Sequence, residues 1–458
     1  MKLPFLDRRE ERARLRKLFL RREGSFAVLF GRRRCGKSRL LRETLPGRTS
    51  IYFVADDRQD TLQRASLATE IARVLPGFDR VDYPQWNALF DRFWEDAPAG
   101  TVLALDEFPA LVAAAREIPS LLQKKLDRNG KKPVHLVLAG SSQEMMQGLV
   151  LDRSSPLYGR ADEILKIAPL PAGWIQQALS EPDAIRAVEA YAVWGGVPRY
   201  WELAREHGSL DVAIREVILS PLGVLHDEPV RLLRDDLRDT AQAASILSLV
   251  GQGSHRPSEI AGRLGKPITS LSRPLQRLVE LGLIERETPF GVHHRAGQRA
   301  LYKVADPFLR FWFRFVEPNR SRLEGRLVGE VAAVVRRGLA AHVGGVWEEL
   351  SRACVPHLTL FDHRWGPASR WWGTGVDRCP MELDLVAESA EGDALLVGEV
   401  RWSREERADR LLDELRRKAE NLPEARGRKV FCALWLRSPI DSTARPWITP
   451  AQVMRTLR

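Results

Sequence analysis

The segment from Gly31 to Ser38 has the spacing G-x-x-x-x-G-K-S, the pattern of a loop that binds the phosphates of a nucleotide. Gly31 and Gly36 allow the backbone to curl, so that successive N–H groups point inward at a polyphosphate. The ammonium group of Lys37 would reach the β- and γ-phosphates, and the hydroxyl of Ser38 would ligate Mg²⁺. These residue types at this spacing predict a site for ATP together with Mg²⁺.

The residues on either side of this loop supply the context that the motif requires. Residues 26–30 have the pattern of a short apolar strand, and residues 38–44 have helical spacing. The loop would therefore lead into a helix N-terminus, which adds positive field for the phosphates. A chance glycine-rich turn is the alternative. Arg34 and Arg39, within and directly after the loop, are further candidate nucleotide-binding residues.

A second motif is suited to holding the metal ion. An apolar strand pattern at 101–106 ends in the adjacent acids Asp106 and Glu107. In P-loop nucleoside triphosphatases an acid at this place holds Mg²⁺ alongside the loop Ser. Glu107 would polarise the attacking water, which is the work of a general base. A solvated acidic turn is the alternative. Ser141 follows another apolar strand pattern, at 134–139, and could sense the γ-phosphate, although a plain turn fits it too.

The whole chain has the composition of a folded, basic protein. Its 458 residues suggest two to four domains, and a hydrophobic content of 44% excludes a disordered chain. The net charge of +11 favours a polyanionic partner such as DNA. Its four cysteines are scattered without a C-x-x-C pair or a nearby His cluster, so we expect no zinc and no disulfides. Neither a signal peptide nor a membrane-spanning run is apparent, and we expect a cytoplasmic protein without membrane contact.

Alternating strand and helix patterns predict a multi-domain α/β protein. In the first 170 residues this alternation is typical of a parallel sheet covered on both faces. The strands are expected at 26–30, 51–55, 102–106, 134–139 and 163–168. The expected domains are a P-loop ATPase core at 1–170, a helical lid at 171–238, a winged helix at 239–303 and a C-terminal α/β domain at 304–458.

The third region has the pattern of a winged helix. A short helix at 257–264, a turn at 265–267, a longer helix capped by Gly282 and a strand follow in order. The second helix would offer hydroxyl, amide and guanidinium groups to a DNA groove. Pro274 is awkward in that helix because it removes a backbone donor. A winged helix used only for packing is the alternative. The candidate DNA-binding residues are Thr269, Ser270, Ser272, Arg273, Gln276 and Arg277.

The C-terminal region contains acids on consecutive strand patterns. Asp384 lies in the strand pattern at 381–386, and Glu399 and Arg401 share one face of the next strand pattern. An acid followed by E-x-K is the arrangement of a metal-dependent nuclease, in which the carboxylates hold Mg²⁺ and the lysine assists the attacking water. Arg401 takes the place of that lysine and cannot shuttle a proton, although it can clamp a phosphate. Upstream, Glu348 or Glu349 on a helix would face the same site. Solvated strand ends are the alternative.

Taken together, these motifs resemble the archaeal-type ATPases of the AAA+ class, in the signal-transduction (STAND) branch, that carry a C-terminal domain of uncharacterised function. That domain has a restriction-endonuclease-like fold, also called PD-(D/E)xK-like. The resemblance covers nearly the whole chain. It rests on the two nucleotide motifs and on six further segments: 5–10, 155–160, 195–200, 305–315, 371–373 and 398–402.

The resemblance implies roles for residues that the motifs alone do not single out. Phe5 and Arg8 would border the nucleotide base, and Arg160 would take the place of an arginine finger. Pro198 and Arg199 would meet the phosphates from the helical lid. The resemblance also matches Glu348, Asp384 and Glu399 to the nuclease acids, with Asp384 and Glu399 as metal ligands, whereas Arg401 departs from the lysine of relatives.

Three hypotheses about function follow. The first is a cytoplasmic AAA+ ATPase that binds and hydrolyses ATP and acts on DNA through the winged helix and the nuclease-like domain. The second is a nucleotide switch of the STAND type that cuts nothing, and the third is a transcription regulator. DNA is the expected partner, and self-association into a homo-oligomer stays open. The aromatic segment 308–315 has apolar residues on nearly all faces of a helix, so we expect it to pack the winged helix onto the C-terminal domain.

Overall fold

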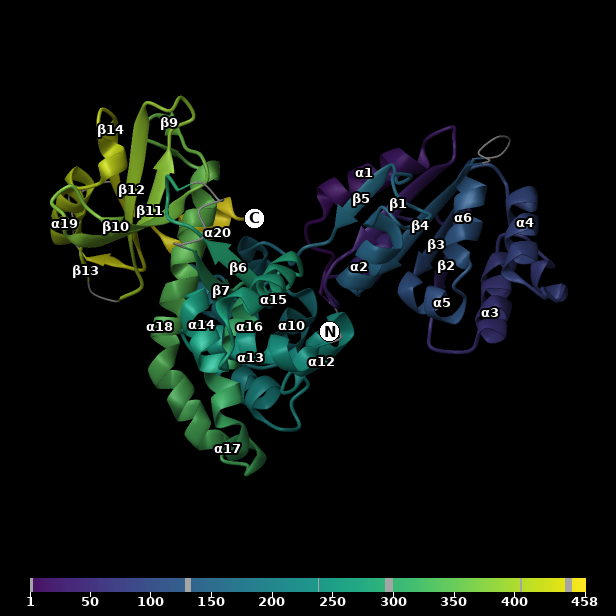
Figure 1. Ribbon diagram of the computed structural model, residues 1–458, viewed down its shortest axis with the longest axis horizontal. Helices are drawn as coiled ribbons and strands as arrows, with labels where there is room; N and C mark the ends of the chain where they lie inside the picture. Colours follow the sequence, from purple (N-terminus) through teal and green to yellow (C-terminus); the bar gives the residue numbers. More distant parts are fainter. Residues whose placement is uncertain (1–2, 128–132, 238, 293–299, 404–405, 441–446) are drawn as a thin grey trace. The chain divides into compact units, whose positions relative to one another are not determined.

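The computed structural model describes residues 3–127, 133–237, 239–292, 300–403, 406–440 and 447–458 (Figure 1). The chain divides into two compact units. The P-loop unit comprises Asp7–Pro169 with Arg234–Arg238. The C-terminal unit comprises Met1–Leu6, Leu170–Leu233 and Asp239–Arg458.

The P-loop unit is built on a five-stranded sheet with the strand order β2-β3-β4-β1-β5, in which all pairs are parallel. This confirms the expected α/β fold with a parallel sheet. Strands β1, β3 and β4 are buried along their whole length, as their unbroken apolar runs predicted. The strands are β1 (Ser25–Phe30), β2 (Ser50–Val54), β3 (Thr101–Asp106), β4 (Val134–Gly140) and β5 (Glu163–Lys166).

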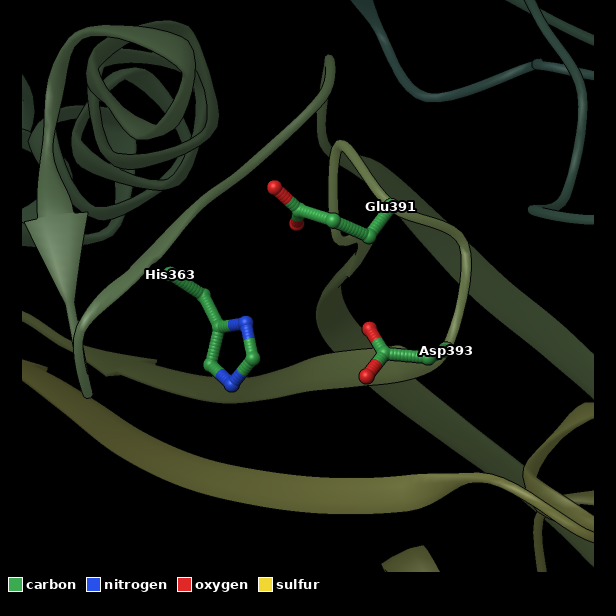
Figure 2. A group of neighbouring side chains, drawn as sticks. All are labelled: His363, Glu391 and Asp393. Carbon is green, nitrogen blue, oxygen red and sulfur yellow. The ribbon is translucent and has the colours of Figure 1, made fainter.

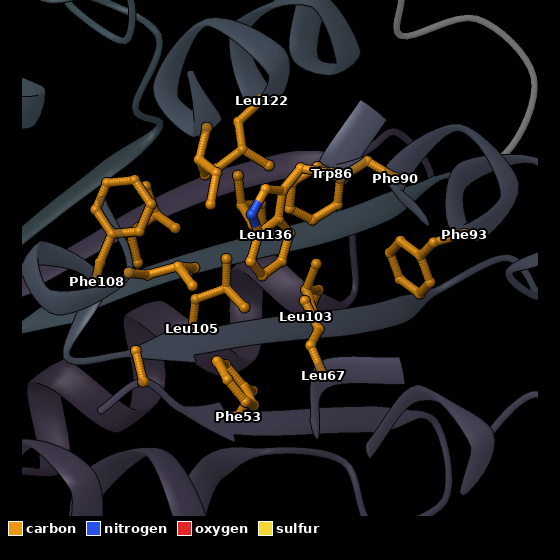
Figure 3. Packing of buried hydrophobic residues seen from close by; sticks show 14 of the residues in the cluster. Phe53, Leu67, Trp86, Phe90, Phe93, Leu103, Leu105, Phe108, Leu122 and Leu136 are labelled. Carbon is orange, nitrogen blue, oxygen red and sulfur yellow. The ribbon is translucent and has the colours of Figure 1, made fainter. Parts of the chain in front are cut away.

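Helices from between the strands bury their apolar sides against this sheet. Figure 3 shows the packing of one face, where Leu103, Leu105 and Leu136 of the sheet meet aromatic and aliphatic side chains of the helices. Trp86, Phe90 and Phe93 of α4 are fully buried there. Helix α1 packs on β1 and β5. The helices are α1 (Arg9–Phe19), α2 (Lys37–Thr44), α3 (Asp60–Ala72), α4 (Trp86–Asp96), α5 (Phe108–Ala114), α6 (Ile118–Asp127) and α7 (Gln143–Met146).

The C-terminal unit begins with a helical region, in which a turn connects Trp194 at the end of one helix to Pro198 at the start of the next. Three helices and a two-stranded antiparallel sheet of β6 (Ile284–Glu287) and β7 (Leu301–Val304) then follow. Pro274 lies in the interior of α15, not in its first turn, and the helix continues through it. The helices are α8 (Ile175–Leu179), α9 (Ala184–Trp194), α10 (Pro198–Arg205), α11 (Leu210–Ala213), α12 (Glu228–Asp236), α13 (Thr240–Gly251), α14 (Pro257–Leu264) and α15 (Ile268–Glu280).

The aromatic segment is a packing element. It forms α16 (Pro307–Phe311) and a π-helical turn over Trp312–Val316, and its five aromatic side chains are all buried. It contacts α9, α13 and α18, and the indole of Trp312 donates a hydrogen bond to the carbonyl of His226 at 2.7 Å. Burial from every side leaves no stacking surface for a ligand on these rings.

The last region of the C-terminal unit contains a mixed sheet with the strand order β10-β11-β12-β14-β16. Strands β10, β11 and β12 are antiparallel, and β12, β14 and β16 are parallel. Helix α18 packs on β11 and β12, and α19 packs on β12 and β14. The elements are α17 (Arg320–Glu324), α18 (Val328–Cys354), β8 (Thr359–Leu360), β9 (His363–Arg364), β10 (Ser369–Thr374), β11 (Pro380–Glu388), β12 (Ala394–Arg401), β13 (Glu406–Arg407), α19 (Ala408–Glu420), β14 (Lys429–Leu436), β15 (Pro439–Ile440), β16 (Trp447–Ile448) and α20 (Pro450–Thr456).

The structure also bears on the state of the cysteines and on membrane-spanning helices. All four cysteines are free, and Cys35 and Cys354 are buried. Of the helices within the described ranges, none is both long and apolar enough to cross a membrane.

Candidate functional site

The predicted phosphate-binding loop connects the end of β1 to the start of α2. Gly31 has a φ of +147°, and a Cβ atom there would lie 2.4 Å from the carbonyl oxygen of Ile167, so only glycine fits. Arg34 and Gly36 also have positive φ values, of 68° and 92°. The loop therefore has the tight curl that the motif predicts, directly before a helix N-terminus.

Lys37 folds back into this loop. Its Nζ atom donates to the carbonyl oxygens of Gly31 at 2.7 Å and Arg32 at 3.1 Å, and the residue is 4% exposed. Its ammonium group therefore lies inside the curl of the loop, where the motif predicts the phosphates. The loop and Lys37 thus fit the phosphates of a nucleotide. Arg39, two residues later in α2, is half-buried.

Asp106, Glu107 and Ser141 lie together at the carboxyl ends of β3 and β4. Glu107 has a φ of 53°, a left-handed conformation that is rare for a residue with a side chain. Its carboxylate accepts hydrogen bonds from the Ser141 hydroxyl at 2.5 Å and the Ser141 backbone N–H at 3.3 Å. Asp106 is 1% exposed and accepts from the backbone N–H of Glu107 at 3.0 Å. The structure therefore brings the predicted base and the predicted γ-phosphate sensor into direct contact.

Tyr52 is a residue of this site that the sequence analysis missed. It lies on β2, which pairs with β3, and its hydroxyl donates to Oδ2 of Asp106 at 2.5 Å. Burial, followed by the bond to Asp106, raises the pKa of Tyr52 to about 12, and a hydrogen bond with Ser38 opposes this shift. The two predicted Mg²⁺ ligands, Ser38 and Asp106, are thus linked through one phenol. A tyrosine within a strand carries no motif, so no signal in the sequence identifies it.

The residues implied by the resemblance have different surroundings. Arg8 is 6% exposed; its guanidinium donates to the carbonyl oxygens of Cys35, at 3.4 Å, and of Ala168. Arg8 therefore lies against the phosphate-binding loop. Arg160 makes a two-pronged ion pair with Asp127, at 2.7 and 3.0 Å.

The remaining three residues implied by the resemblance belong to the C-terminal unit. Pro198 opens α10, and Arg199 is paired with Glu202 at 2.9 Å. Phe5 also falls in that unit. Their roles at the nucleotide stay predictions.

The six predicted DNA-binding residues are all on α15. Its apolar side, formed by Leu271, Leu275 and Leu278, is buried. Five of the six are exposed, and Arg277 is half-buried and paired with Glu280 at 3.5 Å. The helix thus presents an exposed polar face.

Asp384 and Glu399 lie on the adjacent antiparallel strands β11 and β12, each next to a member of the registered pair Leu385 and Gly398. Oδ2 of Asp384 accepts the backbone N–H of Val400 at 2.9 Å. Glu399 is only 4% exposed. Burial and the neighbouring Asp384 raise the pKa of Glu399, and the cations around it oppose this shift. A divalent cation bound between these two carboxylates would offset their mutual repulsion.

Two cations lie on Glu399. Arg401 binds Oε1 of Glu399 and lies 3.7 Å from Asp384, whereas Nζ of Lys418 lies 3.1 Å from Oε2. Lys418 is in the last turn of α19, seventeen residues after Arg401. The E-x-K pattern places its lysine on the strand itself, so this pattern does not identify Lys418 on α19. The site therefore contains a primary amine as well as the guanidinium that replaces the expected lysine.

The structure distinguishes Glu348 from Glu349 on α18. Burial and the charge of Asp384 raise the pKa of Glu348 to about 7, so Glu348 belongs with the acid pair. Glu349 instead binds Arg310 at 2.8 Å and Lys303 at 3.0 Å, and these cations hold its pKa below the ordinary value. Arg352 donates to the carbonyl oxygen of Asp384 at 2.8 Å and lies 3.7 Å from Glu348.

A pocket of about 550 Å³ opens beside Glu348 within the C-terminal unit. It is lined by the end of α13, by β7 and by α18, with Arg314, Arg352 and Arg370 among its basic groups. Arg370 and Arg352 both contact Glu287 of β6. Positively charged groups thus lie between the β6–β7 hairpin and the three acids Glu348, Asp384 and Glu399, which we call the acid cluster.

Comparison with known proteins assigns similarity to two parts of the chain. Residues 5–203 match the family model described as an ATPase domain predominantly from Archaea. Residues 312–411 match a model of archaeal and bacterial proteins of unknown function. An uncharacterized protein of Methanocaldococcus jannaschii is 28% identical over 406 residues, which is 87% of each chain.

Two solved structures are also similar. The Walker-type ATPase of Pyrococcus abyssi aligns with a TM-score of 0.53 and 21% identity, over 68% of this chain and 96% of its own. The ORC2 protein of Aeropyrum pernix aligns with a TM-score of 0.47 and 16% identity, over 71% of this chain and 96% of its own. The first likeness shows the fold. The chain thus has the α/β fold typical of P-loop ATPases, and its residues 5–203 are similar to ATPase domains found predominantly in Archaea.

Proposed function

We propose that the P-loop unit binds ATP with Mg²⁺ and hydrolyses it. The observation that carries this is the convergence at one sheet edge of Lys37 in the curled loop, the Ser38–Tyr52–Asp106 chain, and Glu107. The loop N–H groups and Lys37 would hold the phosphates, while Ser38 and Asp106 would hold Mg²⁺, which neutralises charge on the phosphate oxygens.

Glu107 is the group that would act on water. Its carboxylate is held by Ser141 in the structure, and an attacking water would have to replace that hydroxyl. Ser141 would then be released to contact the γ-phosphate. Arg8 would position the loop through its bond to the Cys35 carbonyl. Arg160, which is paired with Asp127, would need to exchange that partner for a phosphate to act as an arginine finger.

Variants at Lys37 and Glu107 separate binding from turnover. We expect Lys37→Ala to abolish ATP binding, because Lys37 contacts ground-state phosphates, and Glu107→Gln to retain binding while blocking phosphate release. Exposed Glu117 of the same unit supplies a matched control, Glu117→Gln. Equal ATP affinity in wild type and Lys37→Ala, measured by calorimetry, would end the assignment.

We further propose that the C-terminal unit contacts DNA through α15, with α13, α14, α15 and the β6–β7 hairpin acting as a winged helix. The exposed polar face of α15 and the net charge of +11 support this. DNA affinity should fall steeply with salt, since phosphate neutralisation releases counterions. Arg273→Ala with Arg277→Ala should weaken binding and flatten the salt slope. Arg336→Ala with Arg337→Ala, on exposed positions of α18, removes the same charge as a control.

The acid cluster supports a third proposal, a metal-dependent cut of the DNA backbone in a restriction-endonuclease-like domain. Asp384 and Glu399 would hold Mg²⁺, which lowers the pKa of a bound water. Glu348 would be a third acid, and Arg401 would clamp the scissile phosphate. The main support for this proposal is Lys418, because its Nζ atom lies 3.1 Å from Oε2 of Glu399 and supplies the amine that Arg401 lacks. The alternative, a switch that cuts nothing, is favoured by the two cations that already neutralise Glu399.

Incubation of the pure protein with linear and branched DNA, with and without Mg²⁺ and ATP, tests the nuclease proposal. We expect slow, Mg²⁺-dependent cleavage that Asp384→Ala removes and Lys418→Ala strongly reduces. Lys429→Ala, at an exposed position of β14, is the control for loss of a lysine. Arg401→Lys should change little if Lys418 already provides the amine. No cleavage by wild type, with Mg²⁺ binding intact, would favour the switch.

A further inference from the structure

A second group of metal-ligating side chains lies away from both sites. His363, Glu391 and Asp393 each offer a ligand atom, and these atoms all lie within 4.8 Å of one another. Figure 2 shows that the imidazole and both carboxylates surround one small space. We propose that this group binds a divalent transition-metal ion such as Zn²⁺ or Mn²⁺ and so ties the β8–β9 hairpin to the β11–β12 turn.

The backbone brings these three residues together from two turns. Residues Phe361 and Asp362, both with positive φ, make the tight turn between β8 and β9. The chain after β9 then pairs with the end of β11: the N–H of Ala390 donates to the Arg364 carbonyl at 2.9 Å, and the N–H of Gly366 to the Glu388 carbonyl at 2.8 Å. These bonds hold His363 beside the turn that carries Glu391 and Asp393.

Neighbouring residues support the side chains that would bind the metal. The hydroxyl of Ser389, a residue that is 4% exposed, donates to Oδ1 of Asp393 at 2.9 Å. The ring of His363 lies against those of Trp365 and Phe431, with centroids 5.6 and 5.1 Å away. Supporting contacts of this kind orient metal ligands and limit the entropy lost on binding.

Charge favours a cation at this place. Glu391 and Asp393 put two carboxylates close together, and in the described part of the chain no lysine or arginine forms an ion pair with either. A bound cation would remove their mutual repulsion. One imidazole nitrogen and two carboxylate oxygens suit a borderline ion of the zinc or manganese type, with water completing the coordination. Metal bonds of about 2.0–2.2 Å would require these ligand atoms, which lie within 4.8 Å of one another, to move closer together on binding.

This site is separate from the acid cluster. Asp393 precedes the first residue of β12, and Glu399 lies near the other end of that strand. Six residues of strand separate them by about 20 Å at 3.3 Å per residue. The expected role is therefore structural. The scattered cysteines and the lack of a His cluster predicted no zinc site. This group escapes that reasoning because its one His and its two acids come from different turns and form no recognisable sequence motif.

Metal titration of the full chain tests this proposal. After treatment with EDTA and its removal, wild type should bind one Zn²⁺ at this site by calorimetry, with a rise in melting temperature. His363→Ala and the isosteric Asp393→Asn should weaken that binding at least tenfold and lose the temperature rise. Cys379→Ser should leave that binding unchanged, since it removes an exposed thiol that belongs to neither metal site.

The variants must be shown to fold, and ATP binding to the separate P-loop unit does not report this. The far-ultraviolet circular dichroism and the metal-free melting temperature of Asp393→Asn should therefore equal those of wild type, because asparagine keeps the acceptor for Ser389. The inference is wrong if wild type binds neither Zn²⁺ nor Mn²⁺ at 100-fold excess, or if folded His363→Ala and Asp393→Asn bind Zn²⁺ as wild type does.

Discussion

The acid pair of the P-loop unit and the pair Asp384 and Glu399 of the C-terminal unit differ in what surrounds their carboxylates. In the P-loop unit, Asp106 and Glu107 accept hydrogen bonds from the neutral hydroxyls of Tyr52 and Ser141. In the C-terminal unit, Glu399 is bound by the charged groups of Arg401 and Lys418. The acids of the two sites thus have partners of different charge: neutral hydroxyls at the first site and cations at the second.

This difference bears on how each site would treat a metal ion. A hydroxyl holds a carboxylate in place without neutralising it, so the attraction for Mg²⁺ is retained. A guanidinium or ammonium group offsets the carboxylate charge, and a metal ion must compete with it. We therefore expect the P-loop unit to bind Mg²⁺ readily together with a nucleotide, and the acid cluster to bind it weakly unless a phosphate draws Arg401 away.

The largest expected effect is at Asp106. Asp106→Asn keeps the shape of the side chain and its acceptor for Tyr52 but removes the charge that would hold Mg²⁺. We expect ATP turnover to fall by about 10²–10³-fold, in the range seen when one electrostatic group of an active site is lost. Phosphate release at saturating Mg²⁺ measures this. Turnover close to that of wild type would show that Asp106 does not hold the metal.

The next prediction concerns the cations of the acid cluster. Arg401→Met should strengthen Mg²⁺ binding there several-fold, because it removes the guanidinium that binds Glu399 and lies 3.7 Å from Asp384. Mn²⁺ titration of nucleotide-free protein, monitored by relaxation of water protons, measures the affinity. The same titration of Arg401→Met with Asp384→Asn is the control. Unchanged affinity would mean that Arg401 leaves the metal site freely and that the contrast between the two sites is smaller than proposed.

Tyr52→Phe should have a smaller effect, on the P-loop side. Without the phenol, Asp106 loses a donor at 2.5 Å that would compete with Mg²⁺ for the same oxygen. Loss of a hydrogen bond to a charged group costs about 1.5–3 kcal/mol. A water molecule in place of the phenol would recover most of this energy. We expect the Mg²⁺ concentration for half-maximal ATP binding to fall two- to fivefold, as measured with a fluorescent ATP analogue. A rise instead would make Tyr52 a positioning group for Asp106.

The smallest expected effect is the pH dependence of Glu348. Burial and Asp384 raise its pKa to about 7, so the folded protein retains a proton that the unfolded chain releases near pH 4.5. Its contribution therefore stabilises the fold below about pH 4.5 and is lost as pH rises to 7. In the presence of EDTA, the melting temperature of Glu348→Gln relative to that of wild type should therefore be higher at pH 8 than at pH 5. The same gain with Glu117→Gln would rule out Glu348 as the cause.

Much of the P-loop unit could be predicted from local patterns. The five strands begin and end within two residues of the expected ranges, because unbroken apolar runs bounded by polar residues leave little freedom. The helices of the third region also agree, with Leu271, Leu275 and Leu278 inward as their spacing predicted. The pairing of Glu348 and not Glu349 with the acid cluster could not be predicted, because adjacent helical residues differ by about 100° in direction.

The sequence by itself determined the residue types and the local elements that present them: a curled loop before a helix, acids at strand ends, and a polar face on α15. Only the tertiary structure decided which of these groups meet. The strand order places β4 between β1 and β3, so Ser141 meets Glu107, and β2 beside β3, so Tyr52 meets Asp106. Likewise, α19 packs on β12 and brings Lys418 to Glu399. Such contacts join residues far apart in the chain, and linear spacing carries no information about them because the order of strands and the docking of helices depend on the whole core.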